Sequence, residues 1–148
     1  MSRLYEQLTK IPFKVTVDDN MTTVAAYNGD TLLGKVVFEQ VFDAYELDFA
    51  DFMDEDRYYR TFPGNDLIKI AHLQVEPAYR GRGLAKQLVT HGLNLMRRKG
   101  YNQFYLNASP MDRFNGLGLN ELVNFYEQLG FKVLQHRGGN AMMGMVVS

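Results

Sequence analysis

The decapeptide YRGRGLAKQL, residues 79–88, places two glycines one residue apart at the start of an apolar helical pattern. Backbone N–H groups at a helix N-terminus lie at the positive end of the helix dipole, where they bind anions and above all phosphates. Glycine lets the backbone approach such a ligand closely, because it has no Cβ. Arg80 and Arg82 add guanidinium groups that can bind phosphate oxygens. The stretch is either an ordinary strand-to-helix turn or a phosphate-binding cradle.

Two common phosphate-binding loops are excluded by the residues around these glycines. A P-loop requires Gly-Lys-Ser/Thr at the helix start, whereas Gly83 is followed by Leu84 and Ala85. The dinucleotide-binding fingerprint requires a third glycine where this chain has Lys86. What remains is the pattern Arg-x-x-Gly-x-Ala over residues 80–85, directly after an apolar run that ends in Val-x-Pro.

The other residue types with catalytic or metal-binding chemistry are few. The chain contains no cysteine, which excludes disulfides, thiolate metal sites and a cysteine nucleophile. Its three histidines are not spaced as metal ligands, so we expect no metal. His91 is expected on the polar side of a helix and His136 near a hairpin turn, both at the surface. His72 has the chemistry of a base near neutral pH, but strand alternation leaves open which way it faces.

A second charged stretch, DAYELDFADFMDED at residues 43–56, carries seven acidic residues and no basic one. Such a run is either a solvated surface or a wall that concentrates cationic amines, and the aromatic residues of DRYYRTF (56–62) suit a cationic group. Its place before the central strand is compatible with a substrate-side loop. In that case, neutralising Asp54, Glu55 and Asp56 is expected to raise the KM for an amine.

The elements that must position these residues begin with strands. Residues 13–17 alternate as a strand should, and residues 22–41 read as a hairpin with its turn at 27–30. The first ten residues could form a short helix. Residues 66–75 are apolar and β-rich, and Pro77 ends this central strand.

From Gly83 the apolar spacing changes to that of a helix, for which Gly100 supplies the stop. Residues 102–108 form the next strand, Asn120 can cap a second helix, and Gly130 would end it in the left-handed conformation. A final strand pair follows across the turn RGGN. The expected apolar stripes are Leu84, Leu88, Val89, Gly92, Leu95 and Met96, then Leu122, Val123, Tyr126 and Leu129. This order predicts a mixed sheet with helices packed on it.

Length and composition indicate one globular domain spanning residues 1–148, with 46% hydrophobic and 22% charged residues. No apolar run is long enough to span a bilayer, and the N-terminus lacks the apolar core of a secretory signal. A cytoplasmic protein is therefore expected. The net charge of −1 does not predict nucleic-acid binding.

Two motifs carried by these elements resemble those of the GNAT superfamily of acyl-CoA-dependent N-acyltransferases. LQVEPAYRGRGLAKQLVTHGL (73–93) resembles the family's acyl-CoA-binding motif, Arg/Gln-x-x-Gly-x-Gly/Ala after a strand ending in Val-x-Pro. NELVNFYEQLGFKVL (120–134) resembles its Phe/Leu-Tyr-Glu-x-x-Gly-Phe signature, at the usual distance. The resemblance implies an α/β fold: a mixed, mostly antiparallel sheet with a central splayed strand pair, flanked by helices.

The resemblance also implies acetyl-CoA as co-substrate. The family binds the pyrophosphate through the backbone amides of the Gly-rich turn, here Arg80, Gly81, Arg82, Gly83, Leu84 and Ala85. The preceding strand pairs with the pantetheine arm, which assigns Leu73, Gln74 and Val75. Backbone amides, rather than the arginine side chains, are expected to contribute most of the binding to the pyrophosphate. A β-branched residue at Gly83 should then reduce coenzyme affinity more than Arg82→Ala.

The implied mechanism is direct transfer, in which a neutral amine attacks the thioester and coenzyme A leaves as a thiol, without an acyl-enzyme. Tyr126 falls on the tyrosine of the second motif, which touches the cofactor and protonates the leaving thiolate; the alternative is a core tyrosine with a bonded hydroxyl. Asn120 lies one position closer to this tyrosine than the family's cofactor-touching asparagine. It either contacts the cofactor or caps the helix.

No general base stands out in the sequence. The family often uses a glutamate or histidines in the strand before the Gly-rich turn, where this chain offers Lys69, His72 and Gln74, with His72 as the candidate. Asp66 and Glu76 are weaker candidates, and a water relay to bulk solvent is an equal alternative.

Two function classes follow from this resemblance. The first is an N-acetyltransferase acting on the primary amine of a small molecule or a protein. The second is a non-catalytic coenzyme A-binding or interaction module, because fold alone does not establish activity. Nucleic acid is not expected as a partner, since the only basic cluster is the one that the cofactor's phosphates would occupy. No membrane partner is expected, and the chain is expected to be a monomer or a homodimer.

Overall fold

The computed structural model describes residues 13–41, 60–63, 66–81, 83–110 and 117–147. The expected N-terminal helix, the acidic stretch and Arg82 lie outside these residues. The strands are β1 (Phe13–Asp18), β2 (Met21–Asn28), β3 (Thr31–Val41), β4 (Leu67–Val75), β5 (Gln103–Ala108), β6 (Lys132–Arg137) and β7 (Asn140–Val146). The helices are a 3₁₀ turn, η2 (Pro77–Tyr79), and two α-helices, α3 (Leu84–Arg98) and α4 (Leu119–Gln128). The predicted elements agree with these bounds to within one or two residues.

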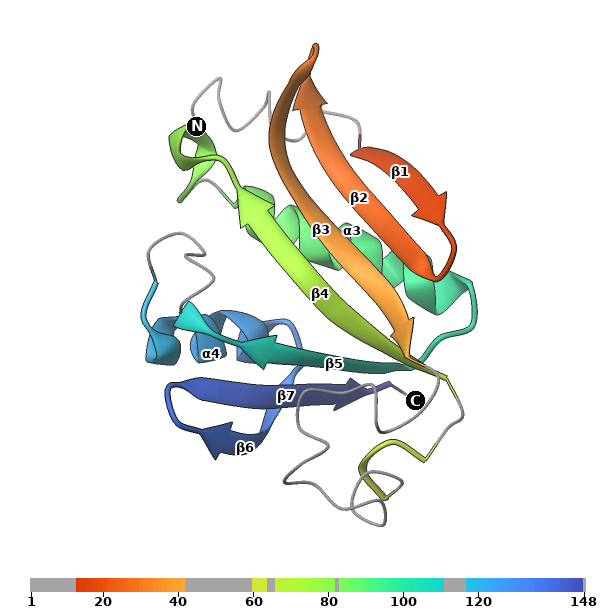
Figure 1. Ribbon diagram of the computed structural model, residues 1–148, viewed down its shortest axis with the longest axis vertical. Helices are drawn as coiled ribbons and strands as arrows, with labels where there is room; N and C mark the ends of the chain where they lie inside the picture. The colour runs from red at the N-terminus through yellow and green to blue at the C-terminus, as the bar shows by residue number, and fades with distance from the viewer. Residues whose placement is uncertain (1–12, 42–59, 64–65, 82, 111–116, 148) are drawn as a thin grey trace.

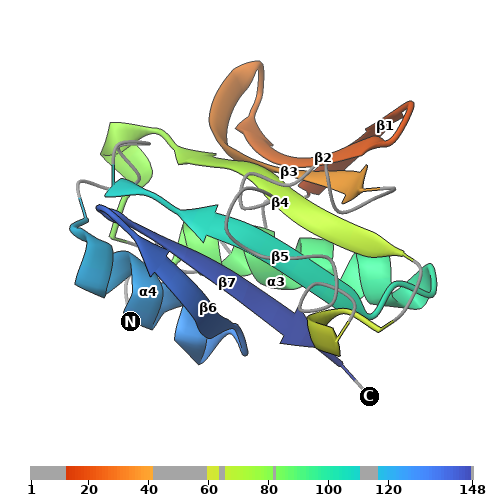
Figure 2. The same cartoon turned by 60° about the horizontal axis from the view of Figure 1, so that its bottom comes forward.

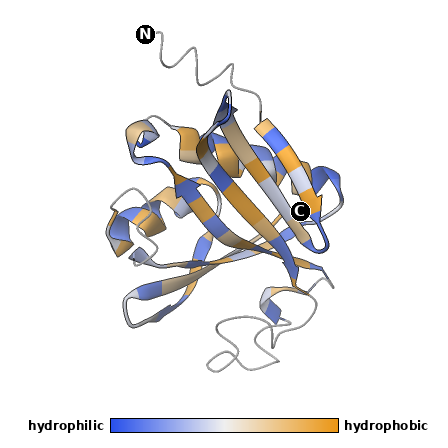
Figure 3. Ribbon diagram, turned by 45° about the horizontal axis from the view of Figure 1, so that its top comes forward, coloured by the Kyte–Doolittle hydropathy of each residue, from blue (hydrophilic) through white to orange (hydrophobic). Residues whose placement is uncertain are grey.

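The described strands form one sheet in the order β1-β2-β3-β4-β5-β7-β6 (Figure 1). Every neighbouring pair is antiparallel except β4 and β5, which run in the same direction. Along the central strands hydrophobic and hydrophilic residues alternate (Figure 3), as expected for strands with one face on a core. The prediction of a mixed, mostly antiparallel sheet is confirmed.

The parallel pair at the centre of the sheet is joined over a short length only. β4 and β5 pair at Ile68↔Phe104, Lys69↔Tyr105 and Ile70↔Leu106. Beyond Leu106 the two strands diverge toward their carboxyl ends, which opens the sheet between them (Figure 1). The expected splayed strand pair is therefore present, and the opening begins after Ile70.

A β-bulge in β4 lies where this opening begins. In the pairing of β3 with β4, Val37 faces His72 and Phe38 faces Ile70, so Ala71 is an extra residue with no pairing partner in β3. An extra residue reverses the alternation of side chains on either side of it. Ile70 and Leu73 consequently both contribute to the core, although they are three residues apart.

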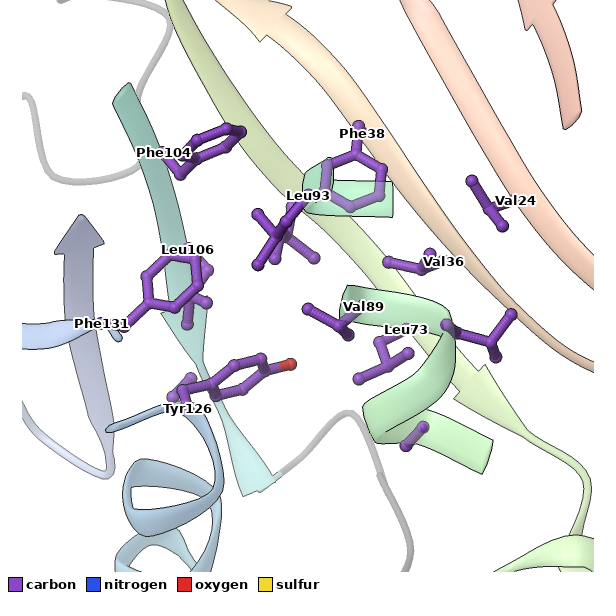
Figure 4. Close-up of a cluster of buried hydrophobic side chains, with 14 of the residues drawn as sticks. Val24, Val36, Phe38, Leu73, Val89, Leu93, Phe104, Leu106, Tyr126 and Phe131 are labelled. Carbon is purple, nitrogen blue, oxygen red and sulfur yellow. The ribbon is translucent and has the colours of Figure 1, made fainter. Parts of the chain in front are cut away.

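Both described α-helices pack on the same face of the sheet, with α3 against β2, β3 and β4, and α4 against β5, β6 and β7 (Figure 2). Between helices and sheet lies the main core, part of which is drawn in Figure 4. The expected apolar stripes face this core, although Leu95, Val123 and Leu129 are only half-buried, and Ala85 and Leu93 are buried as well.

At Gly92 helix α3 packs closely against the sheet. A Cβ at Gly92 would lie 2.2 Å from Cε2 of Phe38, so the ring of Phe38 occupies the space that a side chain would need. Phe38 itself has no exposed surface. The glycine thus sets how near the helix that begins at the Gly-rich turn lies to the central strands.

The opposite face of the sheet carries a smaller cluster at the amino-terminal end of β4. It consists of Val41, Phe62, Leu67, Tyr105 and Met142. Among the described helices, none has both the length and the apolar character needed to cross a membrane.

Two expectations about individual side chains are wrong. His91 is not a free surface residue; it is half-buried, and its ring centroid lies 4.9 Å from that of Phe13. Asn120 does not cap α4, because the helix begins at Leu119 with Gly118 as its N-cap. The Gly118 N–H donates to Oε1 of Glu121 instead, at 3.3 Å.

Candidate active site

The Gly-rich turn follows η2 at the carboxyl end of β4 and leads into α3. Gly81 and Gly83 have φ angles of +76° and +81°, a region that residues with a Cβ rarely adopt. A Cβ at either position would meet nothing within 4 Å. The two glycines are therefore required by the backbone conformation, and the space beside them is open to a ligand.

The first turn of α3 presents unused backbone donors to this space. The first intrahelical bond runs from the Gln87 N–H to the Gly83 carbonyl at 3.1 Å, so the N–H groups of residues 84–86 have no acceptor within the helix. Gly83 has no side chain to cap them, and the first turn contains no acidic residue. These donors point out of the positive end of a 15-residue helix, where an anion is favoured.

Arg80 has a different position from the one its phosphate chemistry suggested. Its Nε donates to the Val75 carbonyl at 3.0 Å, and the side chain is half-buried. The guanidinium thus ties the turn to the last residue of β4. This bond uses one of the five guanidinium N–H donors.

The edge of β4 that faces the opening is available for a further pairing. The Gln74 carbonyl oxygen lies toward β3, where a Cβ on Gly34 would meet it at 2.9 Å. Backbone groups of successive strand residues point to opposite edges, so those of Leu73 and Val75 face the opening. Arg80 occupies the Val75 carbonyl, which leaves the N–H and carbonyl of Leu73 and the N–H of Val75 on this edge.

A narrow cleft of about 40 Å³ occupies the opening between the two strands. Its lining residues come from β4, from the end of β5 and from α4: Ile70, Ala71, His72, Leu73, Leu106, Asn107, Ala108, Ser109, Leu122 and Tyr126. Three residues singled out from the sequence, Leu73, His72 and Tyr126, therefore line the same cleft, although more than fifty positions separate the last from the other two.

Tyr126 enters the cleft from α4. Its side chain is 6% exposed, and its ring makes edge contacts with Phe125 and Phe131, whose centroids lie 5.1 and 6.0 Å away. Figure 4 shows its hydroxyl oxygen pointing from α4 across the core toward Leu73 and Val89. The aromatic contacts fix the ring, so the hydroxyl has a defined direction.

His72 lies on the face of the sheet opposite the helices and is exposed. Its Nε2 lies 3.2 Å from Oε1 of Gln74, and the Nε2 of Gln74 donates to Oε1 of Glu76 at 3.0 Å. These three side chains form a hydrogen-bonded row along β4 that ends at the cleft. The sequence did not predict this row, because the bulge at Ala71 decides which face His72 shares with Gln74.

The asparagine that lines the cleft is not the one that the sequence singled out. Asn120, a candidate cofactor residue, is exposed at the second position of α4 and is not among the residues that line the cleft. Asn107 lines the cleft but did not stand out in the sequence. The available signal was a polar amide near the end of the otherwise largely apolar strand QFYLNA.

Comparison with known proteins places this geometry in a family. Residues 19–133 match the acetyltransferase (GNAT) domain. The chain is 29% identical over 75 residues to the uncharacterized N-acetyltransferase YjgM of Escherichia coli, a match that covers 51% of this chain and 41% of that protein. It is 35% identical over 65 residues to human N-acetyltransferase 8B, covering 44% of this chain and 26% of that protein. The matches thus span less than half of these relatives' lengths.

The fold has counterparts among solved structures. The PaiA N-acetyltransferase of Thermoplasma acidophilum, solved in complex with coenzyme A, superposes with a TM-score of 0.59 at 17% identity. The superposition covers 86% of this chain and 62% of that one. The acetyltransferase (GNAT) domain matches most of the length of the chain, and the fold superposes on that of a solved N-acetyltransferase. This chain belongs to the GNAT acetyltransferase family.

Proposed function

We propose that this protein is an N-acetyltransferase that transfers the acetyl group of acetyl-CoA directly to a primary amine. The observation that carries the proposal is the opening between β4 and β5, which has the Gly-rich turn at the carboxyl end of β4 and Tyr126 in its lining. An extended arm can lie along the open edge of β4 while its phosphates reach the turn. The opening between the strands then receives the thioester.

Acetyl-CoA suits the groups available at each point. The unused N–H groups of residues 84–86 and the left-handed turn at Gly83 offer donors to the pyrophosphate. The backbone groups of Leu73 and the N–H of Val75 offer a partial strand edge to the two amides of the pantetheine arm. The buried apolar side chains of Leu73, Leu106 and Leu122 flank the place of the acetyl group.

The reaction requires one bond to form and one to break. The amine nitrogen attacks the thioester carbonyl carbon, a C–N bond forms, and the C–S bond breaks as coenzyme A departs. One proton leaves the amine nitrogen, and one proton is supplied to the departing sulfur. The directed hydroxyl of Tyr126 is the proposed donor to sulfur, since it is the one phenol among the residues that line the cleft.

The proposed base is His72, and its neighbours determine which nitrogen acts. The carboxylate of Glu76 can only accept, so Gln74 donates through Nε2 and turns Oε1 toward His72. The Nε2 of His72 must then carry the hydrogen of that bond, which leaves Nδ1 with the lone pair.

The first experiment measures the melting temperature with and without acetyl-CoA. Ligand at one hundred times its Kd stabilises the folded state by about 2.7 kcal/mol, which corresponds to a rise of several degrees. Thiol release is then followed over a panel of small primary amines and lysine-containing or free N-terminal peptides. No thermal shift at millimolar acetyl-CoA would contradict the proposal, and a shift without thiol release would favour a non-catalytic coenzyme A-binding module.

The second experiment tests Tyr126→Phe. We expect kcat to fall by about a hundredfold, within the range of general acid catalysis, with the Kd for acetyl-CoA unchanged within about threefold. Tyr101→Phe is the control, because the Tyr101 hydroxyl donates to Oε1 of Gln40 at 3.2 Å and does not line the cleft. Equal kcat values for the two variants would remove Tyr126 from the mechanism.

A further inference from the structure

One polar atom in the cleft lacks a partner. Asn107 Oδ1 is shielded from solvent and makes no hydrogen bond, and it is the only buried side-chain nitrogen or oxygen so identified in the described part of the chain. Buried polar groups in folded proteins are nearly always hydrogen-bonded. An acceptor left unpaired inside a cleft indicates a donor that arrives with a ligand.

The position of Asn107 in the sheet follows from the strand pairing. It is the first residue of β5 beyond the last pair with β4, Ile70↔Leu106, and on the other side it pairs with Met142 of β7. Its neighbours Leu106 and Ala108 belong to the core under the helices, whereas Tyr105 belongs to the cluster on the opposite face. By strand alternation, Asn107 shares the face of Tyr105, which is also the face of His72.

We propose that Asn107 Oδ1 accepts a hydrogen bond from the attacking amine of the acyl acceptor, and so holds its nitrogen in the cleft. This inference rests on the proposed N-acetyltransferase function. An amide oxygen accepts but does not donate, which suits a primary amine, since the amine has N–H groups besides its lone pair. The carbonyl oxygen and the sulfur of the acetyl-CoA thioester carry no hydrogen to donate.

The pantetheine arm of acetyl-CoA also contains hydrogen-bond donors, two amide N–H groups and a hydroxyl, and the geometry favours the amine over these. The Gly-rich turn leads into α3, which packs on one face of the sheet together with α4. The cofactor therefore reaches the opening from the face that carries the helices. Asn107 and His72 lie on the other face, on the two strands that flank the opening. An amine that enters from this face meets the hydrogen-bond acceptor on β5 and the proposed base on β4.

The test uses Asn107→Leu, which keeps the side-chain size and removes the acceptor, and Asn107→Asp, which keeps an oxygen acceptor. Gln103→Met is the matched control: Gln103 lies on the same strand and face, but its Nε2 already donates to the Asp66 carbonyl at 2.8 Å. Isothermal titration calorimetry measures acetyl-CoA binding. It also measures the binding of 2-phenylethylamine and of Nα-acetyl-lysine to the protein–CoA complex, so that the readout does not depend on turnover.

We expect Asn107→Leu to weaken binding of at least one amine by about tenfold, the effect of one lost hydrogen bond to a ligand. Acetyl-CoA affinity should change by less than twofold. Asn107→Asp should retain amine binding. The ligand-free melting temperature of Asn107→Leu should be equal to or above that of the wild type, because an unpaired acceptor is removed. Gln103→Met should lower the melting temperature and leave amine binding unchanged.

Weaker acetyl-CoA binding with unchanged amine binding would assign Oδ1 to the pantetheine arm and overturn the proposal. A lower ligand-free melting temperature for Asn107→Leu would also overturn it, since Oδ1 would then have a partner in the free protein. So would unchanged amine binding, or no amine binding to the wild-type complex. If the wild type binds amines but releases no thiol, the proposed function fails, and loss of amine binding in Asn107→Leu still supports the amine-binding role.

Discussion

Gly83→Val separates the two contributions of the Gly-rich turn, its backbone conformation and its ligand contacts. Gly83 is the N-cap of α3 with φ +81° and ψ 3°, and a Cβ there would meet nothing within 4 Å. In the ligand-free protein the cost is therefore one of backbone strain, about 1–2 kcal/mol for a left-handed residue with a Cβ. A fall of about 2–8 °C in the melting temperature corresponds to this cost for a domain of this length.

The effect on coenzyme binding should be larger than the effect on stability. Relief of the strain at residue 83 reorients the N–H groups of residues 84–86, and the valine side chain occupies the open space beside them. Loss of one hydrogen bond to a charged group costs about 1.5–3 kcal/mol. The Kd for coenzyme A is therefore expected to rise by about tenfold to a hundredfold, as measured by isothermal titration calorimetry.

Gly29→Val is the matched control for this prediction. Gly29 has φ +62°, a Cβ there would also meet nothing within 4 Å, and it lies in the β2–β3 turn rather than at the start of a helix. The two variants should lose similar stability, and Gly83→Val alone should lose coenzyme affinity. Equal Kd values for the two variants would refute the reasoning. A larger loss in Arg82→Ala than in Gly83→Val would mean that side chains rather than backbone amides hold the phosphates.

Two further predictions concern packing and the proposed base. Gly92→Ala should destabilise the fold by about 1–3 kcal/mol in chemical denaturation, since its Cβ would lie 2.2 Å from the Phe38 ring; Phe38→Leu in the same chain should recover part of this loss, and no coupling between the two would contradict the assignment. Gln74→Leu should lower kcat by about tenfold without changing the Kd for acetyl-CoA, because it removes the hydrogen-bond partner that orients the ring of His72. A kcat equal to that of the wild type would count against this role.

The local elements could be predicted because their causes lie within a few residues of each other in the chain. Gly100 and Gly130 end their helices with φ of +101° and +106°, as the positions of glycine after apolar helical stripes indicated. The N-terminus of α4 was harder to predict, because two neighbouring signals compete. Asn120 is the better capping residue by type, yet Gly118 takes the position because its N–H bonds to Glu121.

The face of the sheet on which the His72 side chain lies could not be predicted from alternation along β4. A single extra residue, Ala71, reverses the alternation, and it is defined only by the register of β4 against β3. His72 and Gln74 share a face because they are two residues apart, and the bulge decides that this is the face opposite the helices, where their side chains meet at 3.2 Å. Without the bulge, the same row would lie on the helix side of the sheet.

The order and spacing of the residues were enough to define the helices, the strands, the Gly-rich turn and the two motifs of the GNAT family. These depend on backbone preferences and on apolar periodicity, which act over short stretches of chain. Only the tertiary structure decided that β4 and β5 part after Ile70 and Leu106, and that Asn107 lines the same cleft as Tyr126 with a buried oxygen unpaired. The reason is that strand register and the insertion of β7 between β5 and β6 bring together residues far apart in the chain, and no local propensity records such pairings.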